Sequence, residues 1–340
     1  MIRPPANHDP AMLVIILGVV GVVAAVCIGS MIHVYAFRGN LRFDGWTEYV
    51  RKGWPMFAPL NCALYSFTQR RARRAIMDPQ AFPELDLLRD HWQVIRDEAL
   101  ALHRKGTFDA VKAPDGQAYY DIGFRTFYKY GWSKFYLKWY GYTHRSALAE
   151  CPQTVAILKK VKAVNGAMFS ILPPGSKLTR HLDPVACSLR YHLGLSTPND
   201  DACYINIDGT TYSWRDGEVL MFDETYLHFA FNNSDQHRLI LMCDVERPMH
   251  LPGRIINWFN KIALRMSVVP NAPGDRRGLA NLLFSTLAPV LKRTKALKER
   301  NRPLYLLIKH SVNLTLILLA LALLGLAAWS VLALFRHLTA

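Results

Sequence analysis

The sequence GAMFSILPPGSKLTRHLDP, residues 166–184, opens a region of short apolar runs that turn residues interrupt. Stretches such as PPGS, STPNDD and DG separate the runs. Short strands without long helical segments between them are typical of antiparallel sandwiches and barrels rather than βαβ units. We therefore expect a mainly β core over residues 161–250. Its later runs are SLRYHLGL (188–195), CYINI (203–207), EVLMF (218–222) and HRLILMCDV (237–245).

Residues 38–160, ahead of this core, have a helical and aromatic character. The segment 82–105 carries apolar side chains at helical spacing, which predicts one amphipathic helix. Residues 56–67 are apolar but too short to span a bilayer. We interpret them as core, with a membrane-interface position as the alternative. The aromatic run at 117–141 fits strands, a substrate-facing wall or an ordinary core.

Two long apolar segments flank these regions. Residues 11–37 and 311–335 contain no Asp, Glu, Lys or Arg, and each exceeds the roughly 20 residues needed to cross a bilayer. A cleaved signal peptide is the alternative for the first segment, but its apolar run is longer than the roughly 7–15 residues of a signal-peptide core. We predict transmembrane helices at 11–37 and 306–336.

The chain has 41 Lys and Arg against 26 Asp and Glu, a formal net charge of +15, and much of the excess flanks the two apolar segments. Because Lys and Arg near a span mark the cytoplasmic side, we expect residues 1–10 and the C-terminus in the periplasm and residues 38–305 in the cytoplasm. The basic flanks either only set this topology or also bind anionic lipid head groups. No nucleic-acid-binding motif accompanies the charge, so we expect no nucleic acid partner.

Residues 251–305 are expected to form a basic amphipathic segment at the membrane interface. The stretch 252–268 mixes Arg254, Lys261 and Arg265 with large apolar side chains, which is typical of interfacial helices. The six cysteines show no CxxC spacing, so neither a disulfide framework nor a zinc site is predicted.

His181, Asp183 and His228 have the spacing of a non-haem iron site. Two histidines and one carboxylate can hold Fe(II) and leave coordination positions open for a co-substrate and dioxygen. Residues i and i+2 of a strand project to the same side, so a His-x-Asp pair can supply two ligands. Arg238, which opens the last run, could pair with the distal carboxylate of 2-oxoglutarate. Purely structural histidines are the alternative.

Longer motifs around these residues resemble the aspartyl/asparaginyl β-hydroxylase-like 2-oxoglutarate dioxygenases, and within them the bacterial lipid A 2-hydroxylases. The resemblance implies a double-stranded β-helix core, jelly-roll or cupin-like, with flanking helices and two transmembrane helices. It also implies Fe(II), with 2-oxoglutarate and dioxygen as co-substrates. The resembling stretches include FPELDLLRDHWQVIRDEALAL (82–102), FYLKWYG (135–141), GAMFSILPPGSKLTRHLDP (166–184), YSWRDGEVLMFDETYLHFAFN (212–232) and HRLILMCDVERP (237–248).

The resemblance assigns roles position by position. Asp183 stands where the vertebrate protein hydroxylase has glycine, so we predict it as the third iron ligand, with a role supporting the ligands as the alternative. Asp223 and Glu224 either orient His228 or form a solvated turn. The matched residues are His181 and His228 as iron ligands, Arg238 and Ser170 at the distal carboxylate of 2-oxoglutarate, and Arg190 and His192 at its other end.

The membrane context favours a lipid substrate, because a protein hydroxylase needs no double anchor. We predict hydroxylation of an acyl chain of lipid A at a bacterial inner membrane, with an ornithine-type aminolipid as the second choice. An aspartyl/asparaginyl hydroxylase acting on a protein, and a membrane-tethered binding protein that has lost its chemistry, are the remaining alternatives. The sequence predicts no oligomeric state.

Overall fold

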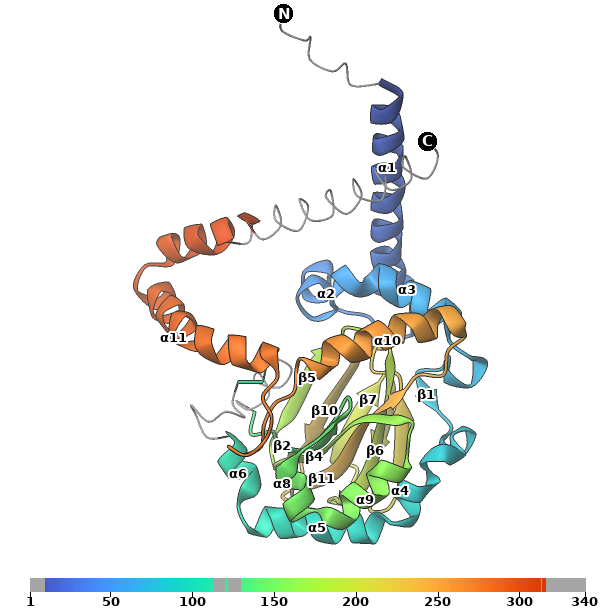
Figure 1. Cartoon of the computed structure of the whole chain (residues 1–340), viewed down its shortest axis with the longest axis vertical. Helices are drawn as coiled ribbons and strands as arrows, with labels where there is room; N and C mark the ends of the chain where they lie inside the picture. Colours follow the sequence, from blue (N-terminus) through green and yellow to red (C-terminus); the bar gives the residue numbers. More distant parts are fainter. Residues whose placement is uncertain (1–9, 113–119, 122–129, 313, 316–340) are drawn as a thin grey trace, which may run out of the picture. The chain divides into compact units, whose positions relative to one another are not determined.

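Two antiparallel sheets form the part of the chain that carries the short apolar runs (Figure 1). The larger has seven strands in the order β1-β9-β6-β11-β4-β2-β3, and the smaller has four in the order β5-β10-β7-β8. The computed structural model describes residues 10–112, 120–121, 130–312 and 314–315. The chain divides into two units, residues 1–282 and 283–340, and both sheets belong to the first.

The predicted mainly β core of antiparallel strands is confirmed. Eight of the strands lie between residues 164 and 246, and β5, β8 and β10 are additional to the runs read from the sequence. The strands are β1 (Ile76–Met77), β2 (Ser133–Trp139), β3 (Tyr142–Thr143), β4 (Val164–Leu172), β5 (Lys177–His181), β6 (Ser188–Ser196), β7 (Cys203–Ile207), β8 (Thr210–Ser213), β9 (Val219–Phe222), β10 (His228–Asn232) and β11 (Arg238–Glu246).

The larger sheet is buried on both faces, which produces two separate cores. Successive residues of a strand point to opposite faces. In β11, Leu239 and Leu241 belong to the core that the sheet shares with α4, α5 and α9, whereas Ile240 and Met242 belong to the core shared with the smaller sheet. This second core encloses the space between the sheets in which polar side chains collect.

Helices and short helical turns precede and follow the sheets (Figure 1). Before β2 come α1 (Pro10–Ile32), η1 (His33–Phe37), α2 (Trp46–Lys52), η2 (Pro55–Phe57), α3 (Ala58–Phe67), η3 (Arg70–Ala72), η4 (Pro79–Ala81), η5 (Pro83–Leu85), α4 (Asp86–Asp90), α5 (Trp92–Arg104) and α6 (Thr107–Lys112). The later ones are α8 (Arg145–Glu150), α9 (Pro152–Lys160), α10 (Leu251–Arg265) and α11 (Leu279–Arg300).

The helix predicted at 82–105 is interrupted, so this prediction is wrong in detail. His91 has φ −110° and ψ 21°, outside helical geometry, and it separates α4 from α5. Its imidazole Nδ1 lies 3.0 Å from the carbonyl oxygen of Leu87. That carbonyl is the acceptor that the backbone N–H of His91 would use in a continuous helix. A side-chain contact therefore replaces a backbone bond at the break.

Two other segments with open interpretations belong largely to cores. In α3, Ala58, Asn61 and Leu64 are buried, which agrees with the core interpretation for this part of residues 56–67, whereas Met56 ahead of α3 is exposed. The described part of the aromatic run contains β2, whose Phe135 packs in the helix-side core and whose Tyr136 packs between the sheets. The rest of that run, residues 117–119 and 122–129, lies outside the described residues.

One helix within the described residues, Gly18–Phe37, is long and apolar enough to cross a membrane. It coincides with most of the first predicted span, and α1 and η1 run without a break from Pro10 to Phe37. The valines of its α1 part are exposed, for example Val22 at 65% and Val26 at 56%, whereas Val34 in η1 is buried. Most of the second predicted span, 306–336, lies outside the described residues.

Candidate active site

His181 and His228 lie opposite each other on paired strands of the smaller sheet. His181 ends β5, His228 begins β10, and the two are direct antiparallel partners. The next pair is Leu178 with Ala230, so β5 has one extra residue between the pairings. Leu178 and His181 are an odd number of positions apart and would face opposite sides of a regular strand. The bulge turns His181 inward, where its ring centroid lies 4.2 Å from that of His228.

Backbone carbonyls fix the same tautomer in both histidines. Nδ1 of His181 lies 2.8 Å from the carbonyl oxygen of Thr179, and Nδ1 of His228 lies 2.9 Å from that of Tyr226. A carbonyl can only accept a hydrogen bond, so each Nδ1 carries the proton and each Nε2 carries the lone pair. This is the tautomer in which an imidazole ligates a metal through Nε2.

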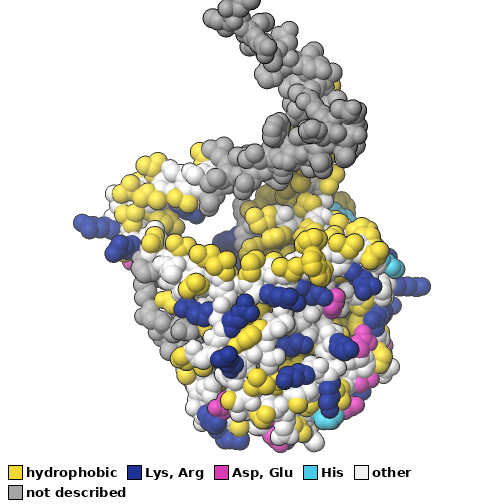
Figure 2. Space-filling model, viewed as in Figure 1, with side chains coloured by type: hydrophobic (Ala, Val, Ile, Leu, Met, Phe, Trp, Pro, Cys, Tyr) yellow, Lys and Arg dark blue, Asp and Glu magenta, His cyan; other side chains and the backbone are white. Residues whose placement is uncertain are grey.

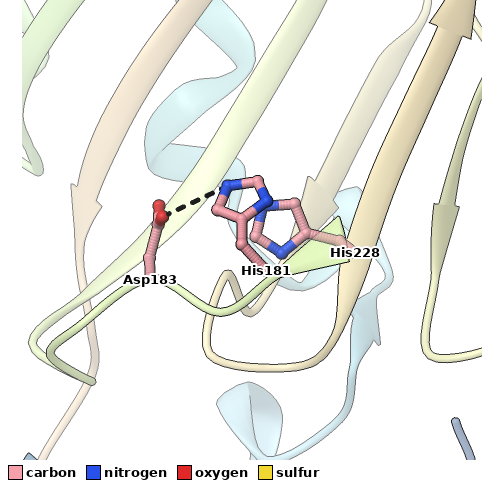
Figure 3. A group of neighbouring side chains, drawn as sticks. All are labelled: His181, Asp183 and His228. Atoms are coloured by element: carbon pink, nitrogen blue, oxygen red, sulfur yellow. Dashed lines mark ion pairs between the residues drawn. The ribbon is translucent and has the colours of Figure 1, made fainter. Parts of the chain in front are cut away.

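Asp183 completes a group of three possible metal ligands (Figure 3). One donor atom from each of Asp183, His181 and His228 lies within 4.8 Å of the other two. Asp183 Oδ1 is 3.6 Å from His181 Nε2. The predicted strand geometry is wrong here, because β5 ends at His181 and Asp183 follows it. Asp183 is instead held by its backbone N–H, which donates to the carbonyl oxygen of Glu224 at 2.9 Å.

The electrostatics keep the three groups in metal-binding protonation states. Burial, and then the neighbouring His181, lowers the pKa of His228 to about 3. Burial also lowers the pKa of His181. Burial alone would raise the pKa of Asp183, but Arg190 and the two histidines outweigh it and hold that pKa below its usual value. Neutral imidazoles and an ionised carboxylate are the forms that bind divalent metals.

Arg190 is surrounded by carboxylates of the chain. Its Nη2 lies 2.8 Å from Asp183 Oδ2, its Nη1 lies 2.5 Å from Asp244 Oδ1, and it also pairs with Glu224. Three acidic groups around one guanidinium fix its position, and through it that of Asp183. The predicted contact of Arg190 with a co-substrate remains a prediction. In the structure the guanidinium contacts Oδ2 of Asp183, whereas Oδ1 of Asp183 faces His181.

Arg238, the first residue of β11, is a buried cation. It is 1% exposed, and its Nη2 donates to Ser170 Oγ at 3.2 Å. Within the described residues, no carboxylate forms an ion pair with Arg238, and its Nε has no hydrogen-bond partner. Burial lowers its pKa to about 10, so it stays charged near neutral pH. A desolvated cation in this state favours a bound carboxylate.

His192 supplies a second buried donor near Arg238. Its Nδ1 accepts from Trp214 Nε1 at 3.3 Å, which places the His192 proton on Nε2. That Nε2 is buried and has no partner among the described residues. The turn that carries Trp214 and Arg215 lies close to β6 because residue 194 of that strand is glycine. A Cβ at Gly194 would lie 1.9 Å from the carbonyl oxygen of Arg215.

A row of rings connects the histidine pair to Arg238. The Phe222 ring lies 5.6 Å from His228 and 5.1 Å from His192. Trp214 is 6.0 Å from His192, and its face covers the guanidinium of Arg238 at 4.4 Å. The sequence interpretation missed Phe222 and Trp214. Alternation in EVLMF would have placed Phe222 on one face with Leu220, but nothing in the sequence indicated Trp214.

The solvated-turn alternative for Asp223 and Glu224 is wrong, because the two side chains are 1% and 4% exposed. Glu224 Oε1 accepts from Ser188 at 2.7 Å, and its other oxygen faces Arg190. Asp223 pairs with Arg247 at 2.7 Å. Both acids support the turn that leads into β10.

The chain is similar in sequence to known hydroxylases. Residues 89–248 match the family model of aspartyl/asparaginyl beta-hydroxylase. An ornithine lipid ester-linked acyl 2-hydroxylase of Rhizobium tropici is 37% identical over 37% of this chain and 46% of that protein. The aspartyl/asparaginyl beta-hydroxylase of Homo sapiens is 32% identical over 48% of this chain and 21% of that protein. A solved Pseudomonas putida prolyl-4-hydroxylase matches 47% of this chain and 88% of its own, at 16% identity and a TM-score of 0.31.

The matched segments thus span less than half the length of these two relatives. Both relatives are named as hydroxylases, and the family match includes every candidate site residue from Ser170 to Arg238. Over residues 89–248 the chain is similar to the aspartyl/asparaginyl β-hydroxylase family.

Proposed function

We propose that the protein is an Fe(II)- and 2-oxoglutarate-dependent dioxygenase that hydroxylates an acyl chain of a membrane lipid. The observation that carries the proposal is the presence of two features between the same two sheets. His181, Asp183 and His228 offer three donor atoms within 4.8 Å of one another. Arg238 lies buried between the same sheets without a carboxylate partner among the described residues. Two imidazoles and a carboxylate form the ligand set of non-haem Fe(II) oxygenases, and a dicarboxylate fits Arg238.

The residues of the chain fit the two co-factors in distinct ways. Iron bound by His181, Asp183 and His228 would supply the oxidation of 2-oxoglutarate and the hydroxylation of a C–H bond, with dioxygen as oxidant and succinate and carbon dioxide as products. Arg238 and Ser170 would hold the distal carboxylate of 2-oxoglutarate. His192 would donate from Nε2 to a carboxylate oxygen. The Phe222 and Trp214 rings would keep water away from this path.

Arg190 carries a second task in this proposal. Its contacts to Asp183, Glu224 and Asp244 hold the third ligand in place. Burial raises the pKa of Glu224 and of Asp244, which reduces the negative charge around the guanidinium. A guanidinium can present several N–H groups in one plane, so Arg190 could orient Asp183 and also reach a co-substrate carboxylate beside it. This reconciles the predicted co-substrate role with the observed ion pairs.

A lipid substrate is supported by the apolar helix and by the named activity of one relative. Leu182 and Leu227, next to the two histidines, pack with Val34 and Tyr35 at the end of the apolar helix. The Rhizobium tropici relative is named for hydroxylation of a lipid acyl chain. We propose lipid A as the first substrate and an ornithine-type aminolipid as the second. A protein substrate is the alternative that the human relative's name suggests.

We also propose that the chain has two spans in a bacterial inner membrane, with residues 38–305 in the cytoplasm. The Lys and Arg that flank the apolar segments support this orientation. Alkaline phosphatase fused after residue 340 should be active, whereas a fusion near residue 150 should be inactive. An active fusion near residue 150 would contradict the topology.

Removal of a metal ligand should abolish iron binding. We expect His228→Ala and His181→Ala to lose bound iron and all turnover, and Asp183→Ala to weaken iron binding at least about 10–100-fold. His91→Ala, at an exposed histidine far along the chain from these residues, is the matched control. Metal analysis of the purified full chain after anaerobic loading measures the effect. Iron content equal to the control in either histidine variant would reject the site.

Arg238→Met should stabilise the protein without co-substrate and weaken the binding of 2-oxoglutarate. It removes a buried cation that lacks a carboxylate partner among the described residues, so the protein without co-substrate should unfold at a higher temperature. It also leaves the distal carboxylate of 2-oxoglutarate unpaired, which costs roughly 3–5 kcal/mol of binding free energy. The KM for 2-oxoglutarate should therefore rise at least about a hundredfold. Arg238→Lys should give a smaller KM effect.

Arg247→Met, which breaks the ion pair with Asp223, is the control and should lower the unfolding temperature. A raised lipid KM with unchanged 2-oxoglutarate KM would assign Arg238 to the lipid instead.

Mass spectrometry of total lipids should identify the substrate. Cells that contain the gene should accumulate one lipid class heavier by a single oxygen atom, and His228→Ala should not restore that mass in a deletion strain. The position of the oxygen in fragment spectra distinguishes lipid A from an ornithine lipid. An unchanged lipid profile together with a newly hydroxylated Asp or Asn in a protein would replace the lipid proposal by the protein alternative.

A further inference from the structure

Helix α10 exposes the side chains that a surface helix normally buries. Leu251, Ile255, Trp258, Phe259 and Ile262 repeat at helical spacing on one face, and they are 66%, 51%, 55%, 62% and 39% exposed. The buried positions of the same helix are Gly253 and Asn257. An amphipathic helix in a water-soluble protein packs its apolar stripe on the core. The apolar stripe of α10 therefore points away from the protein.

A second group of exposed apolar side chains lies on α2 and η2. Trp46, Val50, Trp54 and Met56 are 45%, 50%, 48% and 72% exposed. These side chains and the stripe of α10 together are called the apolar rim. Figure 2 shows hydrophobic side chains gathered in a band over the α10 side of the body. Contiguous exposed apolar surface of this kind marks a binding face.

Helix α3 joins the two parts of the rim to the end of the apolar helix. Ala58 of α3 packs in one cluster with Val34, which lies in η1. Leu64 of α3 packs in another cluster with Ile256 of α10. Gly253 of α10 approaches α3 so closely that a Cβ there would lie 2.9 Å from the Cβ of Phe67. The rim therefore lies near the point from which the apolar helix leaves the body.

We infer that the apolar rim is immersed in the interface of an anionic lipid bilayer. Three of its members, Trp46, Trp54 and Trp258, are of the residue type that prefers the head-group level of membranes. Exposed Arg51 and Arg254 border the apolar side chains, as in helices that bind anionic lipid. The rim adjoins the apolar helix, and the valines of its α1 part are also exposed. The rim thus fits a bilayer better than a second protein.

Immersion of the rim places the candidate metal ligands close to the lipid surface. The backbone N–H of Leu182, between His181 and Asp183, donates to the carbonyl oxygen of Lys52 at 3.1 Å. Lys52 ends α2, which carries Trp46 and Val50. An acyl chain could therefore reach the ligands without crossing bulk water. This inference extends the proposed function, but immersion can be measured without any turnover.

Depth-dependent quenching in the full-length chain tests the rim. Cys27 and Cys62, the two cysteines that are not buried, are replaced by Ala, and a fluorophore is attached through Phe259→Cys. The chain is reconstituted in nanodiscs of anionic lipid that carry a quencher near either the head group or the bilayer midplane. Gln153→Cys, exposed on α9, is the matched control, and Val22→Cys, in the apolar helix, reports a spanning segment.

We expect the head-group quencher to act at position 259 at least about threefold more strongly than at position 153, because interfacial helices reach roughly 5–10 Å into the head-group boundary. At position 22 the midplane quencher should be the stronger one. Equal quenching at 259 and 153 would overturn the inference. A second copy of the chain would cover the rim instead if the emission of the fluorophore at position 259 changes on dilution with unlabelled chain and not with lipid quenchers. That result would also overturn the inference. If the head-group quencher acts on position 259 as expected but the unmodified chain hydroxylates no lipid, the proposed function is rejected and the membrane inference stands.

Discussion

The two ion pairs of Asp223 connect the metal-ligand turn to the ends of two distant segments. Arg247, just after β11, lies 2.7 Å from one carboxylate oxygen, and Arg38, just after the apolar helix, lies 2.8 Å from the other. Burial would raise the pKa of Asp223, but Arg247 and then Arg38 lower it to about 2. Asp223 also accepts from Thr225, which shapes the turn whose next carbonyl, that of Tyr226, orients His228. Loss of one partner in such a buried set costs roughly 3–5 kcal/mol, because the other charges are left without compensation.

The two sheets contribute different parts of the candidate site. The histidines stand on β5 and β10 of the smaller sheet, whereas Ser170, His192 and Arg238 stand on β4, β6 and β11 of the larger one. Close packing of apolar side chains from both sheets sets the separation between the two groups. Arg190 is the polar link, because it projects from the larger sheet and pairs with Asp183. The site consequently depends on the two sheets being packed on each other, and no single strand or loop could form it.

The sequence predicted the elements with regular patterns and missed the irregular ones. Short apolar runs bounded by turn residues predicted β4, β6, β7, β9 and β11, and the resemblance assigned roles to the candidate residues. The bulge in β5 has no sequence signature in KLTRH, although it decides which way His181 faces. The break at His91 arises from one side-chain contact within an otherwise helical pattern. The burial of Asp223 depends on arginines 185 and 24 positions away, and no local pattern reveals such partners.

The depth of the site relative to a membrane bears on which carbon could be oxidised. The leucines beside the two histidines pack on the end of the apolar helix, so the candidate ligands lie at the level where that helix leaves the body. If the helix spans a bilayer, this level is the head-group region rather than the hydrocarbon core. In an acylated lipid, the carbon next to the ester or amide carbonyl lies at the same level, whereas the methyl end lies near the midplane. A metal centre held there would meet the first carbons of an acyl chain before any others, and this geometry favours 2-hydroxylation over oxidation farther along the chain.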